Sequence, residues 1–395
     1  MKAMVIEKKT RSARRMSEIQ PFHVMALLAR ARELEAQGRS IIHMEIGEPD
    51  FPTPQSVIAA GIRALQQGDI RYTPALGLPQ LREAIAGFYL ERYGLRVSRA
   101  RIIVTPGASG ALLLALGMLV NPGDKVLMSD PGYPCNRHLV RLIEGLPIGI
   151  GTSAVNGYQL TSQLIAQHWE ADTAAVMVAS PANPTGTVVD PENLRDIIEK
   201  VEALGGTLIA DEIYHGLVYQ GKAASALSTS DDVFVVNSFS KYFGMTGWRL
   251  GWLVAPESRM HDADKLAQNI FLAASTPAQY AALAAFHPDT IAILERRRIE
   301  FQRRRDYLLP AIRNLGLNVP INPQGAFYLY ADCSRFNNDS ETFAWEILEH
   351  AGVAITPGVD FGRHEARQHV RFAYTTSLEN LVEGVHRLEK FLHKS

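Results

Sequence analysis

Short apolar runs alternate with amphipathic stretches along the first two thirds of the chain. The runs at 102–104, 125–128, 174–178, 207–210, 233–236 and 249–254 are typical of strands, and several are continuously apolar, as in sheets covered on both faces. Between them, residues 80–92, 110–119 and 191–204 show helical periodicity, the last with Asp190 as its expected N-cap. This alternation predicts an α/β fold with a mostly parallel central sheet and helices on both faces.

After about residue 256 the pattern changes to longer helical stretches, which fill residues 263–315. Strand-like runs at 326–331 and 370–373 follow, with helical patterns at 340–350 and from Ser377 onward. They predict a smaller, discontinuous α+β domain, on which a helix at 22–37 is expected to pack. We therefore expect residues 1–45 to form an N-terminal arm and part of the small domain, 46–290 the large domain, and 291–395 the C-terminal small domain.

The composition is ordinary for a globular protein. Of 395 residues, 47% are hydrophobic and 21% are charged, and the formal net charge is −1. A disordered chain would be poorer in apolar residues, and a nucleic-acid-binding protein normally carries a basic excess. We therefore expect neither a nucleic acid nor a membrane as partner. The arginines at 296–298 and 303–305 are expected to form a solvated helix face, because acidic residues lie among them.

Cysteine and histidine usage points away from disulfides and metals. Cys135 and Cys333 are too far apart to suggest a disulfide framework or a cysteine-based metal site. No histidine shows the spacing to other ligands that metal sites use, and we expect no metal. The basic first fifteen residues are not followed by the apolar stretch of a secretory signal. These features favour a cytoplasmic protein.

Four predicted strands end in residues that can carry chemistry. Lys241 follows one strand, and a lysine amine kept partly neutral is a nucleophile. Asp211 and Tyr214 follow another strand, and Asn183 follows a third. Residues 105–110 open a helix with small residues, whose free N–H groups can bind phosphate. Taken singly, each has a commoner structural interpretation: a salt-bridged lysine, a helix cap, a turn and a glycine-rich loop.

Eight short motifs, in this order, resemble those of the fold-type I enzymes of pyridoxal 5′-phosphate, specifically the class I/II aminotransferases. They are Gly47-Glu48-Pro49-Asp50, Tyr72-Thr73-Pro74, Asp130-Pro131-Gly132-Tyr133-Pro134, Asn183-Pro184-Thr185-Gly186, 211–214, 238–241, 247–251 and Val370-Arg371-Phe372. The resemblance extends from about residue 11 to the C-terminus. It implies that the large domain, 46–290, binds pyridoxal phosphate, and that an amino group moves between an α-amino acid and a 2-oxo acid.

The resemblance implies roles for the residues expected at the cofactor ring. Lys241 is expected to bind the cofactor aldehyde as a Schiff base, and then to move a proton at the substrate α carbon. Asp211 is expected to keep the pyridine nitrogen protonated, and Asn183 and Tyr214 to donate to the phenolic oxygen. Tyr133 is expected to stack on the ring. Lys241, Asp211 and Tyr214 are therefore the expected catalytic residues.

Other motif residues are expected at the phosphate and at the substrate. The phosphate is expected to contact small, hydroxyl-bearing and cationic residues, namely Gly107, Ala108, Ser109, Ser238, Ser240 and Arg249. Arg371 is expected to bind the substrate α-carboxylate beside Gly47 and Asn183. Tyr72 is expected to reach the phosphate of a neighbouring subunit, which implies a homodimer with shared active sites. The segment before Gly47 is expected to act as a mobile gate.

The motifs leave the substrate and an alternative reaction open. Ser109 stands where one aspartate-using subgroup carries a lysine, which weakens the case for a dicarboxylic specialist without excluding one. A carbon–sulfur β-lyase would use the same lysine and cofactor, because the bond that breaks depends on substrate orientation. A ligand-sensing regulator needs an added DNA-binding domain, for which the approximately 20 residues before the first predicted helix leave no room. A catalytically inactive homologue is disfavoured because the motif set is complete.

Overall fold

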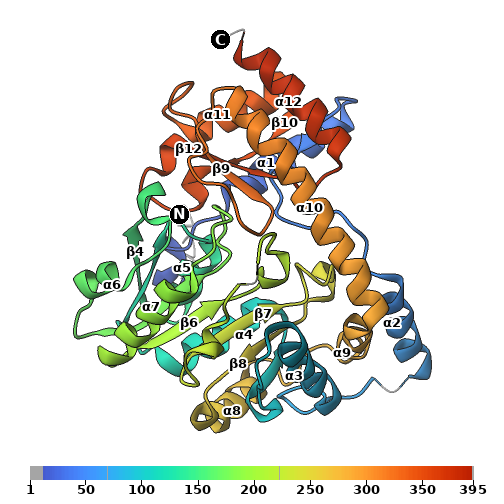
Figure 1. Ribbon diagram of the computed structural model, residues 1–395, viewed down its shortest axis with the longest axis vertical. Coiled ribbons are helices and arrows are strands. Elements are labelled where there is room, and N and C mark those ends of the chain that lie inside the picture. Colours follow the sequence, from blue (N-terminus) through green and yellow to red (C-terminus); the bar gives the residue numbers. More distant parts are fainter. Residues whose placement is uncertain (1–11, 69, 222, 394–395) are drawn as a thin grey trace, which may run out of the picture.

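A seven-stranded sheet forms the centre of the larger part of the molecule (Figure 1). The computed structural model describes residues 12–68, 70–221 and 223–393. In spatial order the strands are β2 (Ile102–Thr105), β8 (Gly251–Val254), β7 (Phe234–Ser238), β6 (Thr207–Asp211), β5 (Thr173–Ala179), β3 (Lys125–Asp130) and β4 (Leu146–Gly151). Only β8 runs antiparallel to its neighbours. The predicted α/β fold with a mostly parallel sheet is confirmed.

Helices cover both faces of this sheet, because successive strand residues point to opposite sides. In β7, Phe234 and Val236 belong to one buried cluster, whereas Val235 belongs to the other. The first cluster includes residues of α4 (Gly107–Leu119), α5 (Pro134–Leu142) and α8 (Met260–Ile270). The second includes residues of α3 (Pro79–Tyr93), α6 (Ser162–His168), α7 (Pro191–Ala203) and α9 (Thr276–Leu283). This double covering explains why the strand sequences are apolar throughout.

Both ends of the chain contribute to a smaller α+β part, above the large sheet in Figure 1. One small sheet pairs β1 (Ile42–His43) with β10 (Val353–Ala354), and another has the order β11 (Thr356–Pro357), β12 (His369–Ala373), β9 (Tyr328–Asp332). They pack with α1 (His23–Ala36), α11 (Ser340–Glu346) and α12 (Leu378–Leu392). The predicted packing of the 22–37 helix is confirmed. The limits at 45 and 290 stay predictions, and residues 1–11 of the expected arm lie outside the described residues.

Several elements were not predicted from the sequence. They are α2 (Gln55–Gln67), α5, α6, β1, β4, β10 and β11. The helical stretch at 263–315 is three helices: α8, α9 and α10 (Pro288–Asn314). Strand β8 starts at Gly251 rather than at residue 249, because the backbone of Arg249 adopts the left-handed conformation, with φ of 53°. Asp190 caps α7 as expected, since its side chain accepts a hydrogen bond from the Asn193 amide.

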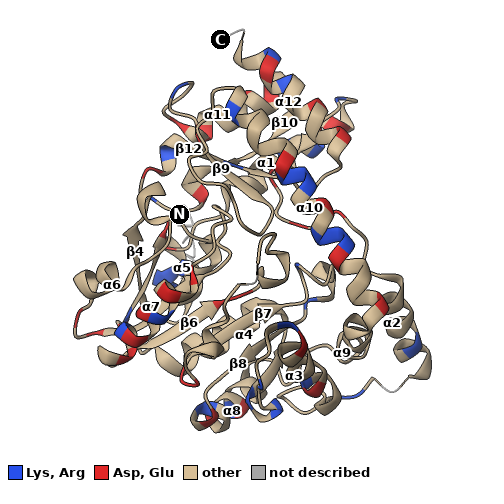
Figure 2. Ribbon diagram, viewed as in Figure 1, with Lys and Arg blue, Asp and Glu red and all other residues tan. Residues whose placement is uncertain are grey.

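The arginines of α10 do not all form a solvated face, and that prediction is wrong for two of them. Arg304 is 4% exposed and pairs with Asp50 at 2.8 Å, so it ties α10 to the segment after Gly47. Arg305 is also buried and donates to the carbonyl oxygen of Pro323. Acidic and basic residues alternate along α10 in Figure 2. No helix among the described residues is long and apolar enough to cross a bilayer.

Candidate active site

A cavity of about 290 Å³ lies where the large sheet meets the smaller part of the molecule. Asp211 at the end of β6 and Ser238 at the end of β7 line it, as does Arg371 of β12. It brings together most of the predicted site residues: Gly47, Ala108, Ser109, Tyr133, Asn183, Asp211, Tyr214, Ser238, Ser240, Lys241, Arg249 and Arg371. Gly107 lies beside Arg249. Tyr72 is 84% exposed and does not line the cavity of its own chain.

Lys241 and Asp211 lie at the ends of neighbouring parallel strands. The Lys241 amine donates a 2.8 Å hydrogen bond to the carbonyl oxygen of Gly47. Burial, together with the charges of Arg371 and Arg249, lowers the pKa of Lys241 to about 8, against the opposing effect of nearby carboxylates. Burial raises the pKa of Asp211 to about 6, although the Ile213 amide and the charge of Lys241 favour its ionised form. The cavity is therefore lined both by an amine of lowered pKa and by a buried carboxylate of raised pKa.

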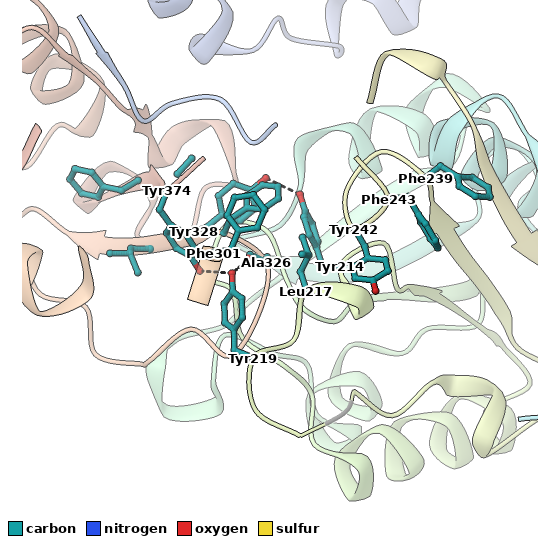
Figure 3. Packing of buried hydrophobic residues seen from close by; sticks show 14 of the residues in the cluster. Tyr214, Leu217, Tyr219, Phe239, Tyr242, Phe243, Phe301, Ala326, Tyr328 and Tyr374 are labelled. Atoms are coloured by element: carbon teal, nitrogen blue, oxygen red, sulfur yellow. Dashed lines mark hydrogen bonds between the residues drawn. The ribbon is translucent and has the colours of Figure 1, made fainter. Parts of the chain in front are cut away.

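Two tyrosine hydroxyl groups meet at the wall of the cavity. The Oη atoms of Tyr214 and Tyr328 are 2.8 Å apart, and Figure 3 shows this contact between the large and small parts of the molecule. The Tyr214 ring also packs edge-on against Phe327, with the centroids 5.4 Å apart. Burial raises the pKa of Tyr214 well above its ordinary value, so its hydroxyl stays protonated and can donate.

One end of the cavity is built to receive an anion. Helix α4 starts at Gly107, so the amides of Ala108 and Ser109 have no partner within the helix. Arg249 approaches this helix start, with its Nη1 donating to the Thr246 carbonyl at 3.1 Å and to the Ser240 hydroxyl at 3.4 Å. Unpaired amides and a guanidinium at one place favour a phosphate or carboxylate.

The opposite end holds a second guanidinium, that of Arg371. Its Nη1 donates to the Asn183 side-chain oxygen at 2.9 Å, and its Nη2 donates to the Glu45 carbonyl and to Thr356 Oγ1. Its carbon atom lies 4.3 Å from the centroid of the Tyr328 ring, a cation–π contact. The Nε atom is buried without a partner among the described residues. Arg371 is thus held rigidly and still has an unmet capacity to donate.

No role was predicted from the sequence for Tyr328, Phe361 or Thr356, which line the cavity from the smaller part of the molecule. The ring of Phe361 lies 4.8 Å from the Arg371 guanidinium carbon. None of the three stands in one of the quoted motifs. The alternation of β9 was the available signal for Tyr328, because alternate residues of a strand share a face.

A model of the family described as aminotransferase class I and II matches residues 39–388. The chain belongs to this family. It is 36% identical to the (5-formylfuran-3-yl)methyl phosphate transaminase of Methanocaldococcus jannaschii, over 97% of this chain and 100% of that protein. It is 38% identical to the valine–pyruvate aminotransferase of Mycobacterium tuberculosis, over 95% of this chain and 97% of that protein. The aspartate aminotransferase of Thermus thermophilus with maleate superposes with a TM-score of 0.91 at 34% identity, covering 96% and 99% of the two chains.

The aminotransferase uses pyridoxal phosphate, as its family does, and the cavity fits that cofactor. A Cβ atom on Gly107 would lie 2.6 Å from Arg249 Nη2, and one on Gly251 would lie 2.7 Å from the Ala108 nitrogen. Both glycines therefore keep the anion-binding end open. At the other side, the buried Asp211 carboxylate accepts a hydrogen bond from the Ile213 amide and lacks a cationic side chain within hydrogen-bonding distance among the described residues. A protonated pyridine nitrogen would supply that positive charge.

Proposed function

We propose that this aminotransferase acts through Lys241, Asp211 and Tyr214 as its catalytic residues. The observation that carries the assignment is the shared cavity, in which a lysine amine of lowered pKa lies with a buried carboxylate and a rigidly held arginine. When bound, pyridoxal phosphate supplies a carbonyl carbon for amines and a ring that withdraws electrons from the substrate. The amine of Lys241 would bind that carbon before substrate arrives, because it is partly neutral near pH 8.

Lys241 also moves the proton of the substrate in this proposal. A substrate amine would displace Lys241, and the freed Nζ atom would then take the proton from the substrate α carbon as a general base and give it up again as a general acid. Gly47 supports this step, because its carbonyl oxygen accepts a hydrogen bond from the amine and so restrains its position. Water would supply the carbonyl oxygen of the departing 2-oxo acid, while the amino group would stay on the cofactor. A second 2-oxo acid would then accept this amino group, with release of water, in the reverse sequence.

Asp211, Asn183, Tyr214 and Tyr133 would orient and polarise the ring. Asp211 would hold the pyridine nitrogen protonated. The positive charge of that nitrogen would in turn offset the free-energy cost of burying the Asp211 carboxylate in its ionised form. Tyr214 has a protonated hydroxyl that can donate to the phenolic oxygen, with Tyr328 holding it in place at 2.8 Å. Asn183 would reach the same oxygen, because its own oxygen is occupied by Arg371 and its amide nitrogen is left to donate.

The remaining assignments concern charged groups on the ligands. Small residues, two serines and an arginine would hold the phosphate: Gly107, Ala108, Ser109, Ser238, Ser240 and Arg249. Arg371 would bind the substrate α-carboxylate through its free Nε atom, with Gly47 and Asn183 beside it. The relatives' names include aspartate, valine–pyruvate and a phosphate-bearing aldehyde, so they do not fix one amino donor.

We also propose a homodimer with shared sites. Ile70, Tyr72, Ile270 and Leu272 are exposed apolar residues, and a 2.7 Å hydrogen bond from Thr276 to the Arg71 carbonyl places their two segments side by side. Such a patch favours a protein partner. A second copy would bring its Tyr72 toward the exposed Arg249. A cytoplasmic location is consistent with Cys135 and Cys333, which are both free thiols.

Borohydride reduction of the holoenzyme, followed by peptide mass analysis, tests the central assignment. We expect the reduced cofactor on the peptide that contains Lys241, and we expect Lys241→Ala to lose both this adduct and transamination. The matched control is Lys265→Ala, since Lys265 is 63% exposed and its amine pairs with Asp262 on the same helix. A Lys241→Ala enzyme that transaminates at the wild-type rate would overturn the proposal.

Subunit hybrids test the shared site. We expect Tyr72→Ala to bind the cofactor weakly and Lys241→Ala to be inactive. A mixed dimer of the two variants has one site with both defects and one with neither, so mixing is expected to restore part of the wild-type activity. Mixing without recovery, in a sample that sedimentation shows to be dimeric, would contradict the sharing of sites.

A further inference from the structure

Helix α1 begins without a capping side chain of its own. Its N-cap residue is Phe22, which makes no side-chain hydrogen bond to the first turn. The first amides of a helix have no partner within it, and a serine, threonine, aspartate or asparagine at the N-cap commonly supplies an acceptor. The amides of His23 and Val24 therefore need acceptors from elsewhere in the molecule.

Asp360 supplies both acceptors, from a segment 337 positions further along the chain. Its Oδ1 atom accepts a 2.7 Å hydrogen bond from the His23 amide, and its Oδ2 atom accepts a 2.9 Å hydrogen bond from the Val24 amide. Asp360 is 3% exposed, so the carboxylate is shielded from competing water. A negative charge at this position also interacts favourably with the positive end of the helix dipole. Asp360 thus caps α1 from a distant part of the sequence.

The capped turn of α1 forms one wall of the catalytic cavity. Phe22, Val24 and Met25 line that cavity. Met25 is also 53% exposed, so the turn lies between the cavity and the solvent. Apolar side chains in this position offer contact area to a bound substrate and keep water away from the reacting groups. The position of this turn therefore bears on substrate binding.

Asp360 is itself held by the large part of the molecule and by the expected carboxylate site. Its carbonyl oxygen accepts a 2.6 Å hydrogen bond from Nη2 of Arg137 in α5. The ring of the next residue, Phe361, lies 4.8 Å from the guanidinium carbon of Arg371. The Phe361 carbonyl oxygen accepts a 2.8 Å hydrogen bond from the Gly132 amide. Asp360 therefore joins the start of α1 to a segment that is fixed on both sides.

The other side-chain contacts of this turn are weaker restraints. His23 Nδ1 lies 3.0 Å from Glu341 Oε1 of α11, but the two side chains are 40% and 45% exposed, and exposed pairs contribute little stability. The ring of Phe22 lies 6.4 Å from that of His138, measured between centroids. The position of the turn therefore depends mainly on the two hydrogen bonds to Asp360.

We propose that Asp360 is a positioning residue for the amino-acid substrate, because its cap keeps the first turn of α1 against the cavity. The inference rests on the proposed function, in which the substrate occupies this cavity with its α-carboxylate on Arg371. Asp360 has no part in the chemistry, since backbone amides engage both of its carboxylate oxygens. Without the cap the turn frays, and only a fraction of the molecules has a complete cavity wall. The apparent affinity for substrate then falls by that fraction.

Hydrogen exchange followed by mass spectrometry tests the cap directly. In the Asp360→Ala holoenzyme we expect the amides of residues 23–27 to exchange about 3- to 30-fold faster than in the wild type, the factor that corresponds to the loss of a helix cap. Asp360→Asn keeps one acceptor oxygen and is expected to give a smaller increase. The matched control is Asp190→Ala, which removes the cap of α7. It is expected to accelerate exchange where α7 begins and to leave α1 unchanged.

Steady-state kinetics connect the cap to substrate binding. The standard amino acids are screened as donors, with 2-oxoglutarate and pyruvate as acceptors, and the best donor is then used for all variants. We expect Asp360→Ala to raise the KM of this donor by about 3- to 30-fold and to change kcat by less than about threefold, because the wall contacts the substrate equally before and during the reaction. Asp190→Ala is expected to leave both constants unchanged.

The two measurements separate the possible failures. Unchanged exchange of residues 23–27 in Asp360→Ala would overturn the cap, and faster exchange with an unchanged KM would overturn its role in substrate binding. A fall in kcat at constant KM would contradict a positioning role. If Asp360→Ala does not fold, Asp360→Asn serves for the same comparison. Absence of transamination with every donor in the wild type would instead contradict the proposed function, and the exchange rates would still decide whether Asp360 holds α1.

Discussion

The amine of Lys241 donates a 2.8 Å hydrogen bond to the carbonyl oxygen of Gly47, 194 positions away in the sequence. The space beside Gly47 is already filled, because a Cβ atom on it would overlap the hydroxyl oxygen of Tyr328. Tyr328 in turn contacts Tyr214 at 2.8 Å. Gly47 therefore contacts the reactive amine on one side and packs against Tyr328 of the small sheet on the other. A methyl group added at Gly47 does not fit between them.

We predict that Gly47→Ala lowers kcat/KM by at least about tenfold, as expected when a reacting group is displaced by about 1 Å. The added methyl group must push Tyr328 or the Gly47 segment away from Lys241. Steady-state kinetics and the cofactor absorbance spectrum measure the effect. The control is Gly87→Ala in α3, where a Cβ atom would meet nothing within 4 Å. That change is expected to leave activity intact and to stabilise the helix by about 0.5–1 kcal/mol. Wild-type kinetics in Gly47→Ala would contradict the fit.

The rate at which the apoenzyme captures pyridoxal phosphate should report the ionisation of Lys241. Only the neutral amine is nucleophilic, and the pKa of about 8 gives half of it in that form near pH 8. We predict a capture rate that rises between pH 7 and pH 8 and levels off above about pH 9. The same reaction with N-acetyl-lysine should keep rising toward pH 10. An enzyme profile that follows the model amine would show that the cavity does not lower this pKa.

The reactive core of the site could be predicted from the sequence because parallel strands bring it together. Asp211 and Lys241 each follow an apolar run, and the carboxyl ends of neighbouring parallel strands meet at one edge. Neither their distance nor their pKa values follow from such a pattern, since both depend on burial by segments far away in the sequence. The carbonyl of Gly47 and the ring of Phe327 are examples of such distant contacts with Lys241.

The parts that the sequence did not predict are set by tertiary packing. Arg304 stands in a charged run that reads as a solvated helix face, yet Asp50 pairs with it in a buried position. Arg137 stands in a short helix that was not predicted, and it donates to the carbonyl oxygen of Asp360, 223 positions away in the sequence. The sequence shows that such residues are polar, but it does not show which distant residue will pair with them and bury them.

Arg371 offers a prediction that separates binding from chemistry. Its Nη1 and Nη2 atoms donate hydrogen bonds to Asn183, to the Glu45 carbonyl and to Thr356. The planar guanidinium makes these contacts and still presents its Nε atom to a carboxylate. Arg371→Lys keeps the charge but has one compact amine, which cannot make these contacts and also bind a carboxylate. We predict that KM for the amino donor rises by about 10- to 100-fold, with a smaller change in kcat. An unchanged KM would remove Arg371 from substrate binding.

The last prediction concerns the cost of keeping Asp211 ionised. Its pKa is raised from 3.8 to about 6 in the folded protein, so folding takes up a proton between these values, and stability falls as pH rises through them. Above pH 6 the full cost of about 3 kcal/mol applies to the apoenzyme, because one pKa unit corresponds to 1.36 kcal/mol. Asp211→Asn removes the charge. We therefore predict that it stabilises the apoenzyme by up to about 3 kcal/mol at pH 7.5, and by about half as much at pH 5.

Denaturant unfolding of the apoenzyme at the two pH values measures this difference. Added pyridoxal phosphate should reverse the order of stability, because a protonated ring nitrogen compensates the carboxylate of the wild type and finds no negative partner in Asp211→Asn. The variant should also lose transamination, which separates the catalytic contribution of the carboxylate from its structural cost. A variant apoenzyme that is less stable than the wild type at pH 7.5 by the same amount as at pH 5 would show that Asp211 is not a strained, ionised group.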